Sequence, residues 1–229
     1  MALYAIGDLH LCLGAPKPMD IFGGAWVGYM EKLREGLSCI QPEDTTVLLG
    51  DLSWALDLDG AKRDFAWIND IPGKKIILKG NHDYWWCTAK KFYDFCGQNG
   101  FSDLWMLNNN HYEYNGYAVC GTRGWFFEEE RSGEHDEKVF KRELIRLEAS
   151  LRSAGDSPKI VFLHYPPRYK GYECPEILDL LQRYEVRQCF YGHLHGGSHK
   201  LAMEGLWDGV EYRLVAADYL NFKPLKVIL

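Results

Sequence analysis

Residues 75–83 read Lys-Ile-Ile-Leu-Lys-Gly-Asn-His-Asp, and this stretch indicates the fold. The apolar run Lys75–Leu78 shows no alternation of polar and apolar residues, which is typical of a strand covered on both faces. The glycine that follows permits a sharp turn off the strand and a close approach of the backbone to a ligand. The stretch therefore predicts a buried strand that presents polar side chains at its carboxyl end.

The same arrangement occurs four more times, after the apolar runs Leu3–Ile6, Thr46–Leu49, Ile160–Leu163 and Cys189–Tyr191. A glycine precedes the polar group in four of the five blocks, at positions 7, 50, 80 and 192. The polar residues that follow the five runs are Asp8, His10, Asp51, Asn81, His82, Asp83, His164, His193 and His195. Because ligands of an α/β sheet bind beyond the carboxyl ends of its strands, we expect these side chains to converge.

Amphipathic helical patterns lie between the apolar runs. Hydrophobic residues recur at spacings of three and four over Trp26–Leu37, Ala61–Ile68 and Phe140–Leu151, as on one face of a helix. Alternation of strands and helices predicts an α/β fold with right-handed crossovers.

A different pattern begins at Leu104. Asn115-Gly116 lies between strand-like flanks, which is a strong hairpin signal. The segments Gly209–Ala217 and Lys223–Leu229 also read as strands. We expect these pieces and the Leu104–Gly124 stretch to form or extend a second sheet.

The composition is that of an ordinary globular protein. The chain has 229 residues, of which 47% are apolar and 25% charged, and these values exclude disordered and collagen-like sequences. We interpret residues 1–229 as a single domain. With 26 basic and 32 acidic residues the net charge is 26 − 32 = −6. An acidic chain disfavours binding to duplex nucleic acid, which needs a broad basic surface, but permits a nucleotide substrate.

Seven cysteines are present, without a Cys-x-x-Cys pair, and we interpret them as reduced thiols. The first residues carry no basic segment of a signal peptide. No apolar run approaches the ~20 residues of a membrane span. We therefore expect a cytoplasmic protein without a membrane span.

Taken in order, Asp8-x-His10, Gly50-Asp51, Gly80-Asn-His-Asp83, His164 and Gly192-His-x-His195 resemble the calcineurin-like metallophosphoesterase superfamily, in particular its bacterial-type phosphohydrolases. The blocks span residues 8–195. The resemblance implies a four-layer sandwich of two mixed β-sheets flanked by helices. It also implies a site for two metal ions at the strand ends.

The resemblance assigns the metal ligands. Asp8, His10 and His195 would hold one ion, Asn81, His164 and His193 the other, and Asp51 would bridge both. Oxygen donors combined with imidazoles suit Mn, which we favour, or Fe or Zn, rather than Ca. A bridging carboxylate holds two ions roughly 3.5–4 Å apart, and water shared between them becomes a hydroxide that attacks phosphorus.

Four further residues are candidates for catalysis or substrate binding. In the family pattern His82 is not a ligand and stabilises the transition state or protonates the leaving oxygen. Asp83 either orients His82 and favours its protonated form or caps the following turn. Arg123 and Arg168 either bind a substrate phosphate or are solvated loop charges.

The predicted function is hydrolysis of a small phosphomonoester or phosphodiester. The alternatives are a catalytically silent binding scaffold, which the intact His82 and ligand set disfavour, and a nuclease, for which the chain has little room. Protein phosphatases of the superfamily carry Glu where this chain has Asp83, so this branch of the superfamily is disfavoured. Candidate aromatic residues around the site, which favour a ring-bearing substrate such as a nucleotide, are Trp85, Trp86, Trp125 and Phe126. The oligomeric state stays open.

Overall fold

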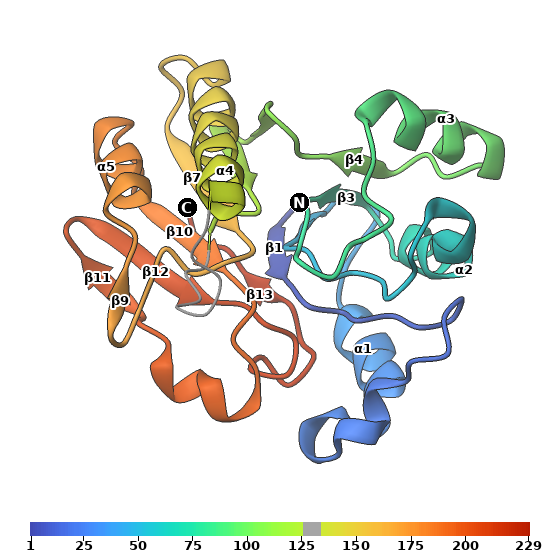
Figure 1. Cartoon of the computed structure of the whole chain (residues 1–229). Coiled ribbons are helices and arrows are strands. Elements are labelled where there is room, and N and C mark those ends of the chain that lie inside the picture. Colours follow the sequence, from blue (N-terminus) through green and yellow to red (C-terminus); the bar gives the residue numbers. More distant parts are fainter. Residues whose placement is uncertain (126–133) are drawn as a thin grey trace.

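Two large mixed sheets form the centre of the protein in the computed structural model, which describes residues 1–125 and 134–229 (Figure 1). The first sheet has the strand order β13-β1-β2-β3-β4. Its strands are β1 (Leu3–Ile6), β2 (Thr45–Leu48), β3 (Lys74–Ile77), β4 (Leu104–Met106) and β13 (Leu225–Lys226). All neighbours are parallel except β13, which runs antiparallel to β1.

The second sheet has the order β11-β12-β10-β7-β6-β5. Its strands are β5 (Tyr112–Tyr114), β6 (Tyr117–Thr122), β7 (Lys159–Leu163), β10 (Gln188–Tyr191), β11 (Gly205–Trp207) and β12 (Val210–Leu214). The four central strands are parallel, and the edge strands β5 and β11 are antiparallel to their neighbours. A small separate hairpin consists of β8 (Arg168–Tyr169) and β9 (Tyr172–Glu173).

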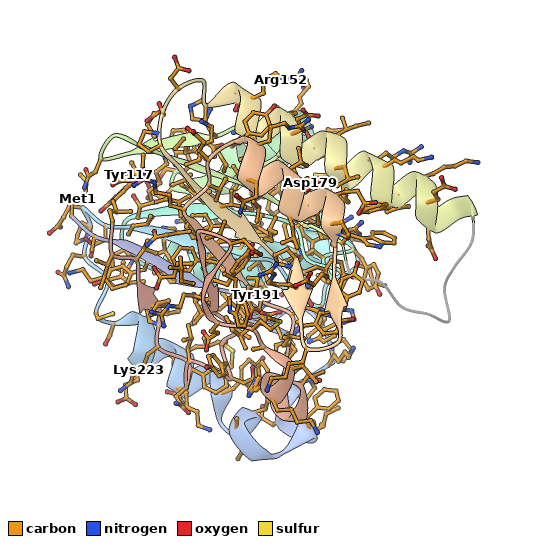
Figure 2. The ribbon with its side chains drawn as sticks, turned by 90° about the vertical axis from the view of Figure 1, so that its left-hand side faces the viewer. Met1, Tyr117, Arg152, Asp179, Tyr191 and Lys223 are labelled. Atoms are coloured by element: carbon orange, nitrogen blue, oxygen red, sulfur yellow. The ribbon has the colours of Figure 1, made fainter. Side chains whose placement is uncertain are left out.

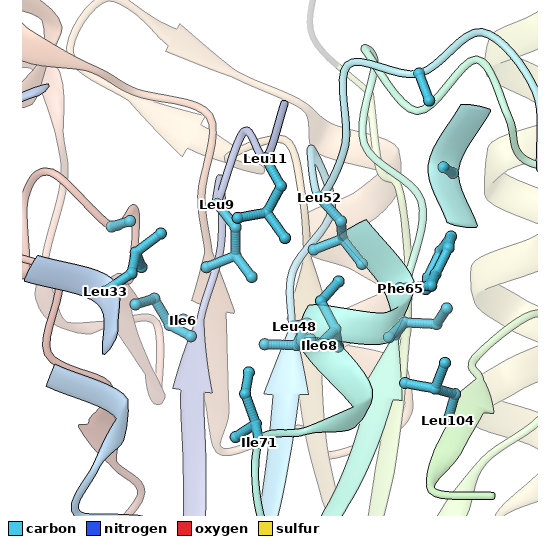
Figure 3. Packing of buried hydrophobic residues seen from close by; sticks show 14 of the residues in the cluster. Ile6, Leu9, Leu11, Leu33, Leu48, Leu52, Phe65, Ile68, Ile71 and Leu104 are labelled. Atoms are coloured by element: carbon cyan, nitrogen blue, oxygen red, sulfur yellow. The ribbon is translucent and has the colours of Figure 1, made fainter. Parts of the chain in front are cut away.

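Helices cover the outer face of each sheet. On the first sheet lie α1 (Tyr29–Leu37), α2 (Leu58–Asn69) and α3 (Ala89–Asn99). Figure 3 shows this layer, where Leu48 and Leu104 of the sheet side lie near Ile68 and Phe65 of α2. In the same view Ile6 of β1 lies beside Leu33 of α1. The second sheet is covered by α4 (Glu134–Ser153) and α5 (Pro175–Arg183). Figure 2 is seen from this side, with Arg152 on α4, Asp179 on α5 and Tyr191 of β10 below them.

The two sheets pack against each other through a third hydrophobic cluster. Val47 and Ile76 of the first sheet share this cluster with Ile160, Phe162 and Phe190 of the second. Each sheet is therefore buried on both faces, which explains why its central strands lack alternation. The predicted four-layer sandwich of two mixed sheets is confirmed. No helix in the described part of the chain is both long enough and apolar enough to cross a membrane.

The expectation for the second sheet was wrong in two places. The hairpin turn at Asn115 and Gly116 is present, with φ angles of 47° and 79°. However, β4 pairs in parallel with β3, and β13 pairs with β1, so both belong to the first sheet. The chain crosses to the second sheet only after β4, where no glycine or proline marks the crossing.

Candidate metal centre

All seven predicted ligands lie where strands of the two sheets end, on the same edge of the sandwich. Asp8 and His10 follow β1, and Asp51 follows β2. His164 follows β7 and His193 follows β10 of the other sheet. The structure brings all of these residues together, as the contacts below describe.

The backbone at these strand ends is strained. Asp8, His10, Asp51 and His193 have φ angles of 61°, 47°, 50° and 71°, in the left-handed region that residues other than glycine rarely adopt. Such a conformation costs on the order of 1–3 kcal/mol per residue and is concentrated at functional sites. Four of the predicted ligands share it, so the local backbone is adapted to aim these side chains rather than to maximise stability.

Two of the glycines before the ligands are required by close packing. A Cβ atom at Gly80 would collide with the carboxylate of Asp51, and a Cβ at Gly192 would collide with Oδ2 of Asp8. Both carboxylates therefore lie directly against the neighbouring strand end. The glycines admit ligand side chains as well as permitting turns.

One group of donors consists of Asp8, His10 and His195. Nε2 of His195 lies 3.3 Å from Oδ1 of Asp8 and 3.4 Å from Nε2 of His10. Asp8 and His10 are buried, and the backbone N–H of His193 donates to Asp8 at 3.0 Å. Two ring nitrogens and a carboxylate that face one another at these distances form a suitable set of donors for one cation.

The second group consists of Asp8, Asp51 and His164. Nε2 of His164 lies 3.7 Å from Oδ2 of Asp51 and 2.7 Å from Oδ1 of Asn81. The same Oδ2 of Asp51 lies 3.8 Å from Nε2 of His10. This oxygen is therefore located between the two groups, as the predicted bridging role requires.

His193 stands at the edge of the second group. Its ring centroid is 5.2 Å from the ring of His164 and 4.6 Å from the ring of Tyr165. The structure thus places the ring of His193 beside that of His164, and their assignment to one ion stays a prediction.

Burial and mutual charge shift the pKa values of these groups strongly. Burial, and next the charge of Asp8, raise the pKa of Asp51 to about 8. Burial, and next the neighbouring His164, lower the pKa of His193 to about 3, and burial likewise lowers the pKa of His10 and His164. Neutral imidazoles offer lone pairs to a metal, and a cation favours ionised carboxylates. The donor set fits divalent ions of borderline hardness.

Asp218 is a buried residue of the site that the sequence analysis missed. Its Oδ1 lies 2.8 Å from Nδ1 of His195, and its Oδ2 lies 3.1 Å from Nε2 of His199 and accepts the N–H of Gly196. A carboxylate on the far nitrogen of a ligating histidine fixes the orientation of the ring. The signal was present in the sequence, since Asp218 follows the apolar residues Val215–Ala217 beyond β12, like the predicted ligands.

His82 lies next to the first group without joining it. Its ring centroid is 5.9 Å from the ring of His10 and 4.5 Å from that of Trp54. Its backbone N–H donates to Oδ1 of Asp51 at 2.7 Å. Burial, and next the charge of Lys17, lower the pKa of His82 to about 4. The half-buried ring of His82 therefore lies beside the first donor group, next to His10.

The hydrogen bonds of Asp83 support the turn-capping alternative. Asp83 is fully buried and accepts backbone N–H groups of Asp51, Leu52 and Gly80 at 2.7–2.9 Å. It also accepts the indole N–H of Trp85 at 2.9 Å. These bonds hold the loops after β2 and β3 together, and none of them goes to the ring of His82. Asp83 therefore positions Asp51 rather than His82.

The two arginines differ from the expectation of a phosphate grip. Arg168 is buried and pairs with Asp208 at 2.8 Å and Glu173 at 3.2 Å, so its charge is used within the fold. Arg123 pairs with the buried Glu143 at 3.4 Å, and its guanidinium lies 5.9 Å from the ring of Tyr165. A contact of Arg168 with a substrate phosphate stays a prediction, and Arg123 is separated from His193 by one aromatic ring.

The three predicted aromatic residues that the structure describes pack against other parts of the protein. Trp85 is buried and packs edge-on against Phe65 in the core. Trp86 packs on Trp85, and Trp125 lies against Phe140 of α4. The fourth residue, at position 126, lies outside the described residues.

Other aromatic side chains contact the site instead, and the sequence analysis did not assign them. Trp54 stacks on His10 with a centroid distance of 4.8 Å, and Trp26 lies 5.7 Å from His10 and 5.6 Å from His195. Both tryptophans lie outside the five polar blocks, so block order alone gives no signal for them.

A four-layer α/β sandwich with carboxylates and imidazoles at its strand ends defines the class of metallophosphoesterases. The family model of the calcineurin-like phosphoesterases matches residues 1–197, and the chain belongs to this family.

Relatives with known names support this assignment. The chain is 30% identical to the glycerophosphodiester phosphodiesterase GpdQ of Enterobacter lignolyticus (strain SCF1), over 52% of this chain and 44% of that protein. The match thus spans less than half the length of this curated relative. The phosphopantetheinyl hydrolase PptH of Mycobacterium tuberculosis has a TM-score of 0.60 at 15% identity, covering 99% of this chain and 95% of that one. TT1561 of Thermus thermophilus has a TM-score of 0.55 at 15% identity, covering 98% and 97%. At these identities the two structures are similar in fold alone.

Proposed function

We propose that the chain is a dinuclear, metal-dependent hydrolase of small phosphomonoesters or phosphodiesters. The observation that carries this proposal is the position of Oδ2 of Asp51, 3.8 Å from Nε2 of His10 and 3.7 Å from Nε2 of His164. One buried oxygen faces one imidazole of each donor group, and a bridging carboxylate is the usual link in a two-metal site. The two groups also share Asp8. The proposed ions are Mn, or alternatively Fe or Zn.

The proposed ligands keep their predicted assignment. One ion is held by Asp8, His10 and His195, the other by Asn81, His164 and His193, with Asp51 between them. The bound ions would neutralise phosphoryl oxygens and activate water as the nucleophile. Asp218 fixes the ring of His195 through the 2.8 Å contact with Nδ1, and Leu49 accepts from Nδ1 of His164 at 3.0 Å. Both contacts leave Nε2 directed at the site.

His82 is the proposed residue for the leaving group. It is half-buried, and its ring is close to His10 without contacting the carboxylates of the two donor groups. Burial and Lys17 lower the pKa of His82 to about 4, so its ring is neutral in the free protein. The proposal therefore requires that the bound anionic phosphoryl group raise this pKa, so that the imidazolium donates a proton to the departing oxygen, which contributes about 10²–10⁴ in rate.

Two further features of the chain support related proposals. The phosphodiesterase activity in the name of the Enterobacter relative supports including diesters among the substrates. A hydrophobic cluster shared by both sheets supports a single domain over residues 1–229. The seven cysteines are free thiols, which supports a reducing, cytoplasmic location.

The test combines metal content with activity. Protein purified with Mn should contain close to two ions per chain and hydrolyse p-nitrophenyl phosphate or bis(p-nitrophenyl) phosphate. Asp51→Asn removes the shared anion, so both ions and the activity should be lost. The matched control is Asp59→Asn, since Asp59 is an exposed carboxylate in the first turn of α2. This control should retain both ions and full activity.

The alternatives give different outcomes. A chain that binds two ions but hydrolyses neither aryl ester nor simple alkyl phosphates would be a binding scaffold. Faster hydrolysis of DNA than of every small ester at equal metal loading would indicate a nuclease.

A further inference from the structure

Five large apolar side chains are exposed on the loops that follow β1, β2 and β3. They are Ile21 (70% exposed), Phe22 (59%), Val27 (57%), Leu56 (76%) and Tyr84 (60%), and we name them the apolar rim. Exposing one such side chain is ordinary, whereas several at one place mark a binding surface. All three loops begin at the strand ends that carry Asp8, Asp51 and Asn81.

Short contacts connect the apolar rim to the metal centre. Trp54, two residues before Leu56, stacks on His10, and its indole N–H donates to Sδ of Met19 at 3.4 Å. Met19 begins the short helix η1 (Met19–Phe22), which carries Ile21 and Phe22 at its end.

The other two rim residues have contacts of the same kind. Val27 follows Trp26, whose ring lies 5.7 Å from that of His10. The ring of Tyr84 is 6.3 Å from that of His82. Val27 and Leu56 are thus one and two positions from tryptophans that contact His10. Ile21 and Phe22 are linked to the site less directly, through Met19 and its contact with Trp54.

The described loops after β7 and β10 contrast with the apolar rim. Up to position 204 they carry no exposed large hydrophobic side chain, and the exposed Leu206 and Trp207 of the second sheet lie on β11. An apolar group beside the phosphoryl position is therefore sheltered from water by the loops of the first sheet rather than by the described loops after β7 and β10.

The cation of Lys17 lies between the apolar rim and the site. Nζ of Lys17 lies 3.1 Å from the ring centroid of Trp54, and no carboxylate lies within ion-pair distance of this ammonium in the described part of the chain. The opposite side of Trp54 is occupied by His10, so its ring is closed to a substrate base. Lys17 thus offers a positive charge to an anionic oxygen at the border between the site and the rim.

We propose that the substrate is an amphiphilic phosphoester, whose phosphoryl group binds at the metal centre and whose aliphatic chain lies on the apolar rim. This inference rests on the proposed function, because it places the phosphoryl group at that site. Full burial of a methylene contributes about 0.8 kcal/mol, and contact with one side only contributes about half of this. Each added methylene should then raise kcat/KM about twofold, and a hexyl ester should exceed a methyl ester about 30-fold.

The test uses the Mn-loaded protein and two ester series, the alkyl p-nitrophenyl phosphodiesters and the alkyl phosphates from methyl to hexyl, all kept below micelle-forming concentrations. The measured quantity is the hexyl-to-methyl ratio of kcat/KM, which is independent of the fraction of active protein. Ile21→Ser combined with Phe22→Ser should reduce the ratio from about 30-fold to below about 5-fold. The matched control is Leu206→Ser, because Leu206 is 74% exposed but lies on β11, outside the apolar rim. In this variant the hexyl-to-methyl ratio should stay at the wild-type value.

The failures of the two proposals differ. Hydrolysis of both series with a ratio near one would overturn the apolar rim and leave the proposed function standing. If no ester is hydrolysed, the proposed function fails. The apolar rim is then tested by binding alone, from the ratio of the dissociation constants of methylphosphonate and hexylphosphonate. Binding to phosphatidylcholine vesicles together with a ratio near one would mean that these side chains meet a membrane surface, which also contradicts the substrate proposed here.

Discussion

Replacement of Asp83 by Asn separates a positioning role from a catalytic one. Oδ2 of Asp83 accepts the N–H groups of Asp51 at 2.8 Å and Gly80 at 2.7 Å. Oδ1 accepts the N–H of Leu52 and the indole N–H of Trp85, both at 2.9 Å. Asn keeps one oxygen and replaces the other with an NH₂ group, which faces two donors and accepts from neither.

The expected loss follows from this arrangement. Whichever way the carboxamide is turned, two hydrogen bonds to a charged acceptor are lost, and each contributes about 1.5–3 kcal/mol. Asp83→Asn should therefore lower the free energy of unfolding by roughly 3–6 kcal/mol. For a chain of this length this corresponds to a fall in Tm of roughly 10 °C or more.

Metal affinity should fall as well, because the loop that carries Asp51 loses its anchor. Loss of a partner that orients a ligand typically costs 10–100-fold in affinity. Urea unfolding of the metal-free protein and titration with Mn measure the two effects separately.

Asp44→Asn is the matched control. Asp44 is also buried but lies at the other end of β2, where Oδ1 accepts the N–H of Ala2 at 2.6 Å and Oδ2 that of Gln41 at 2.9 Å. Only one hydrogen bond is lost in this variant, so about half the destabilisation is expected, without a change in Mn affinity.

A loss of less than about 1 kcal/mol in Asp83→Asn would refute the reasoning. Unchanged stability and metal content with a large fall in kcat would instead show that Asp83 acts through His82.

Three further predictions concern single side chains. His82→Asn should keep the metal content and lower kcat about 10²–10⁴-fold, with a smaller loss for aryl than for alkyl leaving groups in steady-state assays. Gly192→Ala should lower the affinity for Mn, because the added Cβ displaces the carboxylate of Asp8. The control Gly197→Ala should leave the affinity unchanged, because its Cβ meets no atom within 4 Å. Equal Mn titrations of the two variants would contradict this prediction. Burial lowers the pKa of Lys75 from 10.5 to about 8. Between pH 8 and 10.5 the unfolded chain therefore binds more protons at Lys75 than the folded chain does, and the free energy of unfolding of the wild type rises with pH. Lys75→Met lacks this contribution, so the wild type should gain stability relative to the variant as pH rises from 8 to 10.5. Urea unfolding of both proteins at pH 7.5 and 9.5 measures the shift, and a constant difference would show that Lys75 titrates normally.

Much of the fold could be predicted because local chemistry and tertiary position agree at the central strands. Within the run Lys75–Leu78 the three residues after the buried Lys75 are all apolar, because β3 is buried by a helix layer on one face and by the second sheet on the other. The edges were less predictable. β13 has two residues, and its pairing with β1 depends on tertiary position rather than on its own composition. The helix α3 begins at the cap Thr88, whose side chain accepts the N–H of Lys91 at 3.4 Å, a signal that was present but not used.

The candidate site was predictable where a residue type follows a strand end and unpredictable where a residue acts through space. The order of the polar blocks predicted which side chains would converge, and the structure brings them together. Trp54 was not assigned because stacking on His10 depends on the path of the loop after β2. The ion pair of Arg168 was not predicted because its partner Asp208 lies forty positions further along the chain, and a local sequence pattern carries no signal for such a pair.

The location of the site between the sheets explains why its ligands are spread over so much of the sequence. Both donor groups combine residues from the two sheets, since Asp8 meets His195 in one and His164 in the other. The contacts that orient these ligands also join the sheets, as His164 Nδ1 donates to the carbonyl of Leu49 at 3.0 Å and the N–H of Gly7 donates to that of Val215 at 2.8 Å. Neither sheet alone contains a complete donor group, so packing of the sheets and assembly of the site are one event. Ions at the proposed centre would bind the folded chain, and at a concentration of about 100 times Kd an ion would contribute about 2.7 kcal/mol to its stability. That contribution would offset part of the cost of holding Asp8, His10, Asp51 and His193 in left-handed conformations.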